Sequence, residues 1–478
     1  MDVGNLKWKD LDRKIVQINS IEGTGTVWLP FAPPMTGKSA GSGFLLAGQP
    51  GLVLTNAHVV QGTLGIMVRW PQLAGEPVPA QLVNICRERD VALLRLERIP
   101  AFLQPWVGLE LEPKFVQLEE IMTAGYPFGN PSLKLTLGNI SGLNPNQLHN
   151  FWEDVETVPL YLEMTAPINE GNSGGALINS QGKCVGIVSA GVPDANAVGL
   201  AIPAFIVSAI LPDLLSGQPV QLVKLACLFQ PGYPELYREL GFEPIRDDPV
   251  LKQAEGVYVT KVFADTSFPE LQPGAILLAM MQGEKVYPID SQGLIMDIHN
   301  QTGPSTGGIK TIPIKQIVQS CQQAKLVVWQ QGRLQTLHCQ QYQPAAIREV
   351  DIVLEGYPYI LIAGLCLGPL TLNHVNEMMS KGKTQLAKYL DFHGEMCNHH
   401  SLEPPIIVCH VFPGTRASQL DVVQPGDLVA EYRFTGDNFV LVTDDEKRLV
   451  IDRTKAEADD RAVKAHLSSL DQQNGISH

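Results

Sequence analysis

The pentapeptide Gly171-Asn172-Ser173-Gly174-Gly175 is the stretch of this 478-residue sequence that decides the fold. Glycines around a serine permit a tight turn with positive φ, because glycine has no Cβ. Such a turn can expose the serine hydroxyl while nearby backbone N–H groups point at one spot, as acyl transfer at a serine requires. Asn, Ser and Gly also build ordinary hairpin turns, so other parts of the sequence must separate the two interpretations.

A nucleophilic serine needs a base, and the base needs a group that orients it. His58 is the candidate base, because it follows an apolar run that ends in the polar turn Thr55-Asn56. Asp90 is the candidate orienting group, because it precedes the apolar run 91–96, where a carboxylate can be partly buried against His58. Each residue alone has an ordinary structural interpretation. Together, in the order His, Asp, Ser of chymotrypsin-type barrels, they predict a serine nucleophile.

The composition is that of a globular protein, with 45% hydrophobic and 18% charged residues. The 43 glycines and 35 prolines favour many turns and a β-rich fold. The net charge of -14 argues against nucleic acid or an anionic membrane as the main partner. Eight scattered cysteines, most of them in apolar stretches, are typical of free thiols in a reducing compartment.

No targeting segment is evident at the start of the sequence. Residues 1–10 are charged and lack the apolar core of a signal peptide. The apolar run 360–367 is too short for a membrane helix and is typical of a buried strand, so we expect no integral membrane segment. We therefore expect a cytoplasmic protein without a cleavable signal peptide, or one delivered to another compartment or cell without a cleaved signal.

The organisation along the chain predicts three parts and a tail. Residues 14–210 contain many short apolar runs separated by turns, which indicates a barrel or sandwich closed by a helix near 205–215. Two further units follow, to about 345 and 465, and both contain a Gln-Pro-Gly turn between strand-like runs. A duplicated module after a catalytic unit suggests binding or regulation. The polar tail, residues 466–478, is expected to be disordered.

Residues 14–210 resemble the protease domain of the Deg/HtrA family of chymotrypsin-fold serine proteases. Seven ordered pieces carry the resemblance: Gly41-Ser42-Gly43-Phe44, Thr55-Asn56-Ala57-His58-Val59-Val60, Asp90-Val91-Ala92-Leu93-Leu94, Ala124-Gly125-Tyr126-Pro127-Phe128-Gly129, Gly138-Asn139-Ile140-Ser141-Gly142, Gly171-Asn172-Ser173-Gly174-Gly175 and Gly199-Leu200-Ala201-Ile202-Pro203. The resemblance implies a mainly β protein, with a chymotrypsin-like double β-barrel (1–216) followed by two PDZ-like domains (217–345 and 346–465).

The resemblance also implies a mechanism: His58 as general base, Asp90 as its orienter, Ser173 as nucleophile, and an oxyanion hole in the turn Gly171-Asn172-Ser173. It implies an ATP-independent endopeptidase that cuts protein or peptide substrates through an acyl-enzyme, needs no cofactor and can form trimer-based homo-oligomers.

Two positions close to Ser173, Asn172 and Pro167, bear on control and specificity. Asn172 is neutral, so it cannot form the ion pair with a new N-terminus that activates zymogens; we expect control by the loops 139–154 and 190–198. Pro167 stands six residues before Ser173, where trypsin-like enzymes have Asp. With Ala190, Val198 and Leu200 nearby, this predicts a pocket for a small or medium aliphatic side chain, although these three residues are also typical of strand core.

Glu170 departs from the family pattern, which commonly has Pro there. An acid beside the oxyanion hole could favour a collapsed hole, or it could simply face solvent. The first possibility keeps an alternative function open, a catalytically silent protease-fold binding protein or chaperone.

The parts after the protease domain contain two further candidate sites. Residues 231–287 resemble a PDZ domain in which Leu240-Gly241-Phe242 would be the carboxylate-binding turn; an ordinary turn without a ligand is the alternative. Residues 350–455 resemble the second PDZ-like module of plant-type Deg proteases. The cluster His393, Cys397, His399, His400 and Cys409 does not have the spacing of a closed zinc site, so we expect no metal there.

Overall fold

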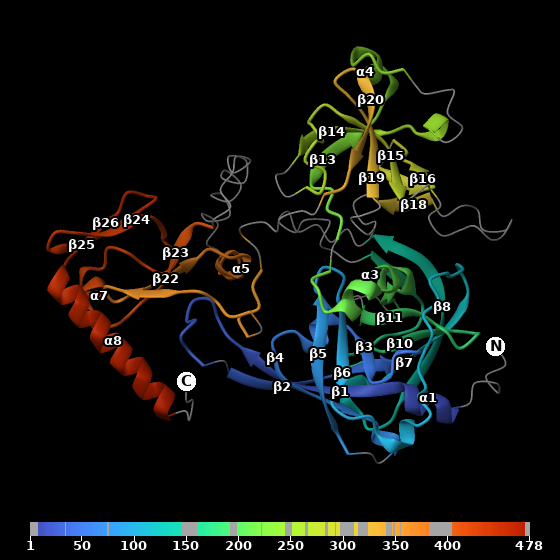
Figure 1. Cartoon of the computed structure of the whole chain (residues 1–478), viewed down its shortest axis with the longest axis horizontal. Helices are drawn as coiled ribbons and strands as arrows, with labels where there is room; N and C mark the ends of the chain where they lie inside the picture. Colours follow the sequence, from blue (N-terminus) through green and yellow to red (C-terminus); the bar gives the residue numbers. More distant parts are fainter. Residues whose placement is uncertain are drawn as a thin grey trace. The chain divides into compact units, whose positions relative to one another are not determined.

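Two closed β-barrels of six strands each form the N-terminal part of the chain (Figure 1). The computed structural model describes residues 8–33, 35–73, 76–145, 160–191, 198–220, 222–243, 251–262, 266–282, 285–291, 293–296, 310–313, 324–340, 347, 349–353, 355–381 and 404–473. Every helix in these ranges is too short or too polar to traverse a lipid bilayer.

The first barrel has the strand order β1-β2-β3-β6-β5-β4. Its strands are β1 (Ile15–Thr24), β2 (Met35–Leu45), β3 (Leu52–Thr55), β4 (Thr63–Arg69), β5 (Val78–Cys86) and β6 (Val91–Leu96). Helix α1 (Trp8–Lys14) precedes β1, and the short helix α2 (Ala57–Val60) directly follows β3.

The second barrel has the order β10-β11-β12-β9-β8-β7. Its strands are β7 (Glu120–Gly125), β8 (Lys134–Pro145), β9 (Leu160–Met164), β10 (Ala176–Asn179), β11 (Cys184–Gly191) and β12 (Gly199–Pro203). Helix α3 (Ala204–Ser216) follows, as the apolar run 205–215 predicts. The two barrels confirm the predicted mainly β, chymotrypsin-like double barrel.

Strands β3 and β6 are buried on both faces, because successive side chains of a strand point in opposite directions. Val53 and Leu94 belong to the core cluster of the first barrel. Leu54 and Leu93 point the other way and belong to a cluster that includes Ile187 of the second barrel. The continuous apolar runs thus place the ends of β3 and β6 at the junction of the barrels, where His58 and Asp90 lie.

Two more antiparallel sheets follow the barrels. The first contains β13 (Cys227–Pro231), β14 (Val257–Val262), β15 (Ile276–Gln282), β16 (Lys285–Pro288), β19 (Ala324–Gln330) and β20 (Arg333–His338), with α4 (Pro234–Glu239) and the separate pair β17 (Leu294–Met296) and β18 (Lys310–Pro313). The second contains β21 (Ile360–Ile362), β22 (Leu365–Pro369), β23 (Ile406–Val411), β24 (Leu428–Thr435), β25 (Asn438–Thr443) and β26 (Arg448–Asp452), with α5 (Leu372–Ser380), α7 (Arg416–Leu420) and α8 (Arg453–Gln473).

The chain divides into two compact units, and the C-terminal unit is discontinuous in sequence. It consists of residues 22–37, 62–64 and 344–478. Val27, Trp28 and Phe31, from the connection between β1 and β2, pack in a core cluster with Tyr357 and Phe412. Residues 27–31 of this connection therefore contribute to the core of this unit, whereas the strand β2 begins at Met35 and is exposed at its start.

Two expectations for this unit need correction. The apolar run 360–367 is not one strand but a hairpin, because Ala363 and Gly364 both have positive φ (54° and 74°) and form a two-residue turn. The tail is not disordered from residue 466, because α8 continues to Gln473. Ala456 and Val463, seven residues apart on one face of this helix, are buried.

Candidate active site

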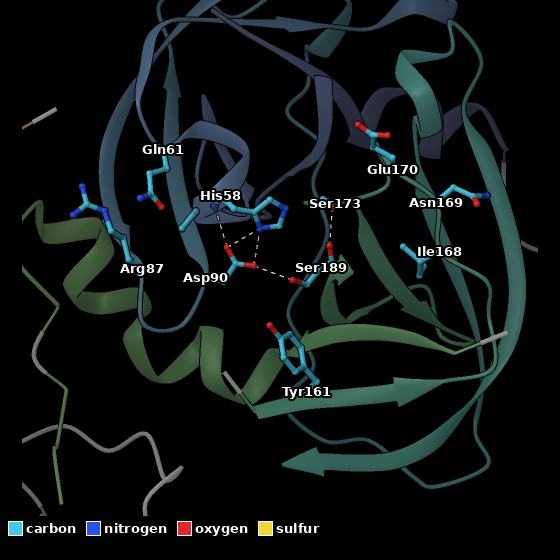
Figure 2. Close-up of a pocket in the computed structure, with 11 residues that line it drawn as sticks. His58, Gln61, Arg87, Asp90, Tyr161, Ile168, Asn169, Glu170, Ser173 and Ser189 are labelled. Carbon is cyan, nitrogen blue, oxygen red and sulfur yellow. Dashed lines mark hydrogen bonds and ion pairs between the residues drawn. The ribbon is translucent and has the colours of Figure 1, made fainter. Parts of the chain in front are cut away.

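A cleft of about 540 Å³ lies at the junction of the two barrels. Its described lining comes from both of them: Ala57, His58, Gln61, Arg87 and Asp90 from the first, and Tyr161, Ile168, Asn169, Glu170, Ser173 and Ser189 from the second. The three residues predicted as base, orienter and nucleophile thus meet in one cleft (Figure 2).

Asp90 holds His58 through its side chain and its backbone. Both carboxylate oxygens of Asp90 lie 2.9 Å from His58 Nδ1, and Oδ1 also accepts a hydrogen bond from the His58 backbone N–H at 3.0 Å. A carboxylate beside Nδ1 makes that nitrogen the donor, so Nε2 of a neutral imidazole is the acceptor. The pair therefore presents a base at Nε2.

Ser189 is a functional candidate that the sequence interpretation missed. Its hydroxyl donates to Asp90 Oδ2 at 2.9 Å, and its side chain is buried at the end of an apolar segment of β11. Tyr161 lies beside this pair (Figure 2). Burial, and then the negative charge of Asp90, raise the pKa of Tyr161 to about 12, so its hydroxyl is protonated at neutral pH.

The hydroxyl of Ser173 donates to the backbone carbonyl of Ser189 at 2.6 Å. Within the described residues, no hydrogen bond joins Ser173 to His58. A serine side chain has three staggered rotamers, so one rotation about Cα–Cβ can redirect Oγ. The structure therefore records a resting orientation of the hydroxyl, and hydrogen bonds of this kind often form only when substrate is bound.

The turn before Ser173 leaves two N–H groups for an oxyanion. The carbonyl of Glu170 accepts a hydrogen bond from the Phe128 N–H at 2.6 Å. It therefore does not accept a hydrogen bond from either of these two N–H groups. Gly171 has φ 90°, which favours glycine, and a Cβ there would lie 2.6 Å from Phe128 N. The N–H groups of Gly171 and Ser173 have no acceptor among the described residues.

Asn172 does not fit its predicted place in the oxyanion hole. Its N–H donates to the carbonyl of Asn169 at 3.1 Å, inside the turn. This N–H is therefore already used, which leaves the N–H groups of Gly171 and Ser173 as the backbone donors for the predicted hole. The side chain of Asn172 is buried, with Oδ1 near Gly125.

Ser42, from the Gly41-Ser42-Gly43-Phe44 motif, fixes this turn from the first barrel. Its fully buried hydroxyl donates to the carbonyl of Gly171 at 2.7 Å and accepts from the N–H of Tyr126 at 2.8 Å. Its backbone N–H donates to the carbonyl of Ser173 at 2.8 Å. One residue of the first barrel therefore holds the carbonyls of Gly171 and Ser173, the two neighbours of Asn172.

Val198 and Leu200 are not among the described residues that line the cleft, and the side chain of Ala190 lies outside the described part of the structure. Leu200 is buried and pairs with Ala190 between β11 and β12, whereas Val198 is half-buried. Tyr161 and Ile168 of the second barrel line the cleft instead. Residues 146–154 and 192–197 of the two predicted control loops lie outside the described residues.

The turn Leu240-Gly241-Phe242 does not fit the predicted carboxylate-binding turn. The N–H groups of Leu240, Gly241 and Phe242 donate to the carbonyls of Leu236, Arg238 and Tyr237, respectively. These bonds end helix α4, with Gly241 at φ 70°, so no N–H of the turn remains for a peptide terminus. Phe242 is buried against Tyr237 and Trp329.

The possible metal cluster is largely outside the described residues, since 382–403 include His393, Cys397, His399 and His400. Among the residues that are described, no group of three or more His, Cys, Asp and Glu side chains could hold a metal ion. Cys409 is buried in the C-terminal unit, 3.8 Å from Nε2 of His374. Hydrogen bonds, first from Cys366, lower the pKa of this thiol.

Comparisons with known proteins agree with the fold. The family model for the trypsin-like peptidase domain matches residues 41–187, which include His58, Asp90 and Ser173. The chain is 28% identical over 240 residues to a protein named "Serine protease DegP homolog" of Plasmodium falciparum, covering 50% of this chain and 26% of the relative. It is 32% identical over 175 residues to "Putative serine protease HhoB" of Synechocystis, covering 37% and 40%, respectively.

A solved structure of an HtrA-type protease, AlgW with a decapeptide, is 21% identical to this chain, with a TM-score of 0.47. The match covers 70% of this chain and 97% of that one. The chain spans between a quarter and two fifths of the length of the two curated relatives above. Residues 41–187 thus match the trypsin-like peptidase domain, and curated relatives of this chain are named as a DegP homolog and as DegP-like serine proteases.

Proposed function

We propose that the protein is a serine endopeptidase of Deg/HtrA type that cuts protein substrates without ATP. The observation that carries the proposal is the hydrogen-bonded set His58–Asp90–Ser189 in the same cleft as Ser173. The names of the curated relatives support the same class.

The reaction would proceed in two halves. Ser173 Oγ rotates away from the Ser189 carbonyl and attacks the scissile carbonyl, while His58 Nε2 takes its proton. Asp90 keeps Nδ1–H oriented and stabilises the imidazolium. The N–H groups of Gly171 and Ser173 bind the oxyanion; removal of one such donor typically costs about 10²–10³-fold in kcat.

His58 then gives the proton to the leaving amine, and the acyl group remains on Ser173. Water, deprotonated by the same imidazole, hydrolyses the ester and restores the serine. Every proton transfer in the proposed cycle uses His58, so this mechanism requires no metal or cofactor.

We propose that the cleft accepts a small or medium aliphatic side chain at the cleavage site. Pro167 replaces the acid that would hold Arg or Lys, and Ile168 adds an apolar wall. The sheets after the barrels are proposed to recruit substrate or to tune the loops of the site.

The test of the proposed function is Ser173→Ala. Wild-type protein should cleave casein and react covalently with a fluorophosphonate probe, and the variant should do neither. Unchanged proteolysis by the variant would exclude Ser173 as the nucleophile.

The alternative is a protease-fold binding protein without activity. The bond from Ser173 Oγ to the Ser189 carbonyl favours it, because a hydroxyl in this orientation is not activated by His58. Failure of the wild-type serine to react with the probe, with or without added unfolded substrate, would support this alternative.

A further inference from the structure

Asn56 directly precedes helix α2, but its side chain does not form the hydrogen bond that is usual at this position. It is the N-cap residue of α2, where Asn normally accepts a hydrogen bond from an N–H of the first helical turn. Its side chain makes no such bond, although it is completely buried. The amide is used elsewhere.

Both ends of this amide bind backbone groups next to the predicted catalytic residues. Oδ1 accepts a hydrogen bond from the Gly174 N–H at 2.6 Å, directly after Ser173. Nδ2 donates to the backbone carbonyl of Asp90 at 2.9 Å. One side chain therefore connects the peptide after the nucleophile, in the second barrel, with the orienting residue in the first.

The two bonded backbone segments are unusual in conformation and in packing. Asp90 has φ 52°, a left-handed conformation that is uncommon for residues other than glycine. The bond from Asn56 therefore helps hold the peptide that follows it. Gly174 has so little space that a Cβ would lie 2.1 Å from the Ser42 carbonyl oxygen and 2.2 Å from Thr55 Oγ1.

We infer that Asn56 is a positioning residue, which sets the distance between the His58–Asp90 pair and Ser173. The inference rests on the proposed function. Because the base and the nucleophile come from different barrels, small shifts of one barrel against the other would change the reacting distance. The Asn56 amide opposes such a shift, because it binds the carbonyl of Asp90 and the N–H that directly follows Ser173.

The prediction is a loss of kcat rather than of substrate binding, since Asn56 does not line the cleft in the described residues. Asn56→Ala should lower kcat about 100-fold, because misplacement by about 1 Å can cost that much, and should leave KM within about threefold. The rate of fluorophosphonate labelling of Ser173 should fall with kcat.

Asn179→Ala is the matched control. Asn179 is also buried, and its Oδ1 accepts two backbone hydrogen bonds, from Gln181 and Lys183, in a hairpin turn after β10. The control should lower the melting temperature without changing kcat at temperatures where it is folded.

Asn56→Asp keeps the acceptor for the Gly174 N–H and removes the donor to the Asp90 carbonyl. It should lose at least tenfold in kcat and provides the test should Asn56→Ala not fold. A kcat within threefold of wild type for a folded Asn56 variant, or an equal loss in Asn179→Ala, would overturn the inference. Inactivity of the wild type, or activity of Ser173→Ala, would instead overturn the proposed function.

Discussion

Ser189 donates a hydrogen bond to Asp90 Oδ2 at 2.9 Å, while its carbonyl accepts the Ser173 hydroxyl at 2.6 Å. Ser189→Ala would remove the first bond and keep the second, because only the first uses the side chain. A hydrogen bond to a charged group contributes about 1.5 kcal/mol or more, so kcat/KM should fall roughly tenfold or further. Peptide hydrolysis under single-turnover conditions measures the change.

The control for this substitution is Ser180→Ala in an exposed turn. It also removes a serine hydroxyl, but one that has no bond to Asp90, so kcat/KM should be unchanged. Equal activity of the two variants would show that the Ser189–Asp90 bond does not contribute to catalysis.

Gly171→Ala should abolish most activity. The added Cβ would meet Phe128 N at 2.6 Å and would sit at φ 90°, so the turn must move, and the N–H groups of Gly171 and Ser173 would move with it. We expect a loss of about 100-fold or more in kcat, measured with a chromogenic peptide.

Gly182→Ala is the control for Gly171→Ala, because it introduces a side chain at a positive φ without a steric clash. Gly182 has φ 77°, but a Cβ there would have nothing within 4 Å. This variant should lose some stability and retain wild-type kcat. A similar kcat for both glycine variants would contradict the proposed role of the Gly171 turn.

Three weakly acidic side chains of the barrels, two of them fully buried, should weaken the fold when they ionise at alkaline pH. Burial is the main cause that raises the pKa of Cys86, Cys184 and Tyr161 to about 12. A raised pKa means that the folded state favours the neutral form. The stabilisation is therefore complete below the unfolded-state values, about 9 for Cys and about 10 for Tyr, and it is lost as pH rises toward 12.

Urea denaturation between pH 7.5 and 11 checks this prediction. The free energy of unfolding should decline above about pH 9, by up to about 1.4 kcal/mol per pH unit for each ionising group. Cys184→Ala removes one ionising group, so the free energy of unfolding should decline less steeply with pH, by up to about 1.4 kcal/mol per pH unit. This change in slope is expected even if the substitution also alters the stability at neutral pH. A slope identical to that of wild type would contradict the assignment for Cys184.

Trp28 should be important for the stability of the C-terminal unit. Its ring contacts His374 edge-on, with the centroids 4.7 Å apart. Trp28→Ala should cost about 2 kcal/mol, less than a fully buried aromatic residue, because Trp28 is only half-buried. Calorimetric unfolding of the full chain measures the loss.

Trp28→Phe gives a sharper comparison at the same position. The indole N–H is buried and has no acceptor among the described residues. Phe keeps an aromatic contact and removes that N–H, so this variant should lie within about 1 kcal/mol of wild type. A loss as large as that of Trp28→Ala would show that the indole N–H contributes to stability.

The sequence was sufficient for those parts of the cleft that depend on local signals. Ser173 is in a glycine turn, and His58 and Asp90 adjoin apolar runs that become strands β3 and β6. The double barrel follows from the same runs, because strands buried on both faces require a second layer.

Ser189 and Asn56 could not be assigned roles in this way. Each is a polar residue beside apolar ones, and its importance depends on partners about 16 to 118 positions away in sequence. The prediction at Leu240-Gly241-Phe242 was wrong for a different reason. A glycine with positive φ ends a helix as readily as it forms an anion-binding turn, and only the hydrogen-bond partners distinguish the two.

Val27, Trp28 and Phe31 belong to a core whose other members lie more than 300 residues later. During synthesis the ribosome releases these three side chains long before residues 344–478 exist. If the first barrel folds during synthesis, its β1–β2 connection exposes Trp28 and Phe31 at that stage, and such transiently exposed apolar surface is prone to aggregation. A fragment that begins at residue 344 would lack the same three side chains, so domain truncation at that boundary should yield an incompletely packed, aggregation-prone product.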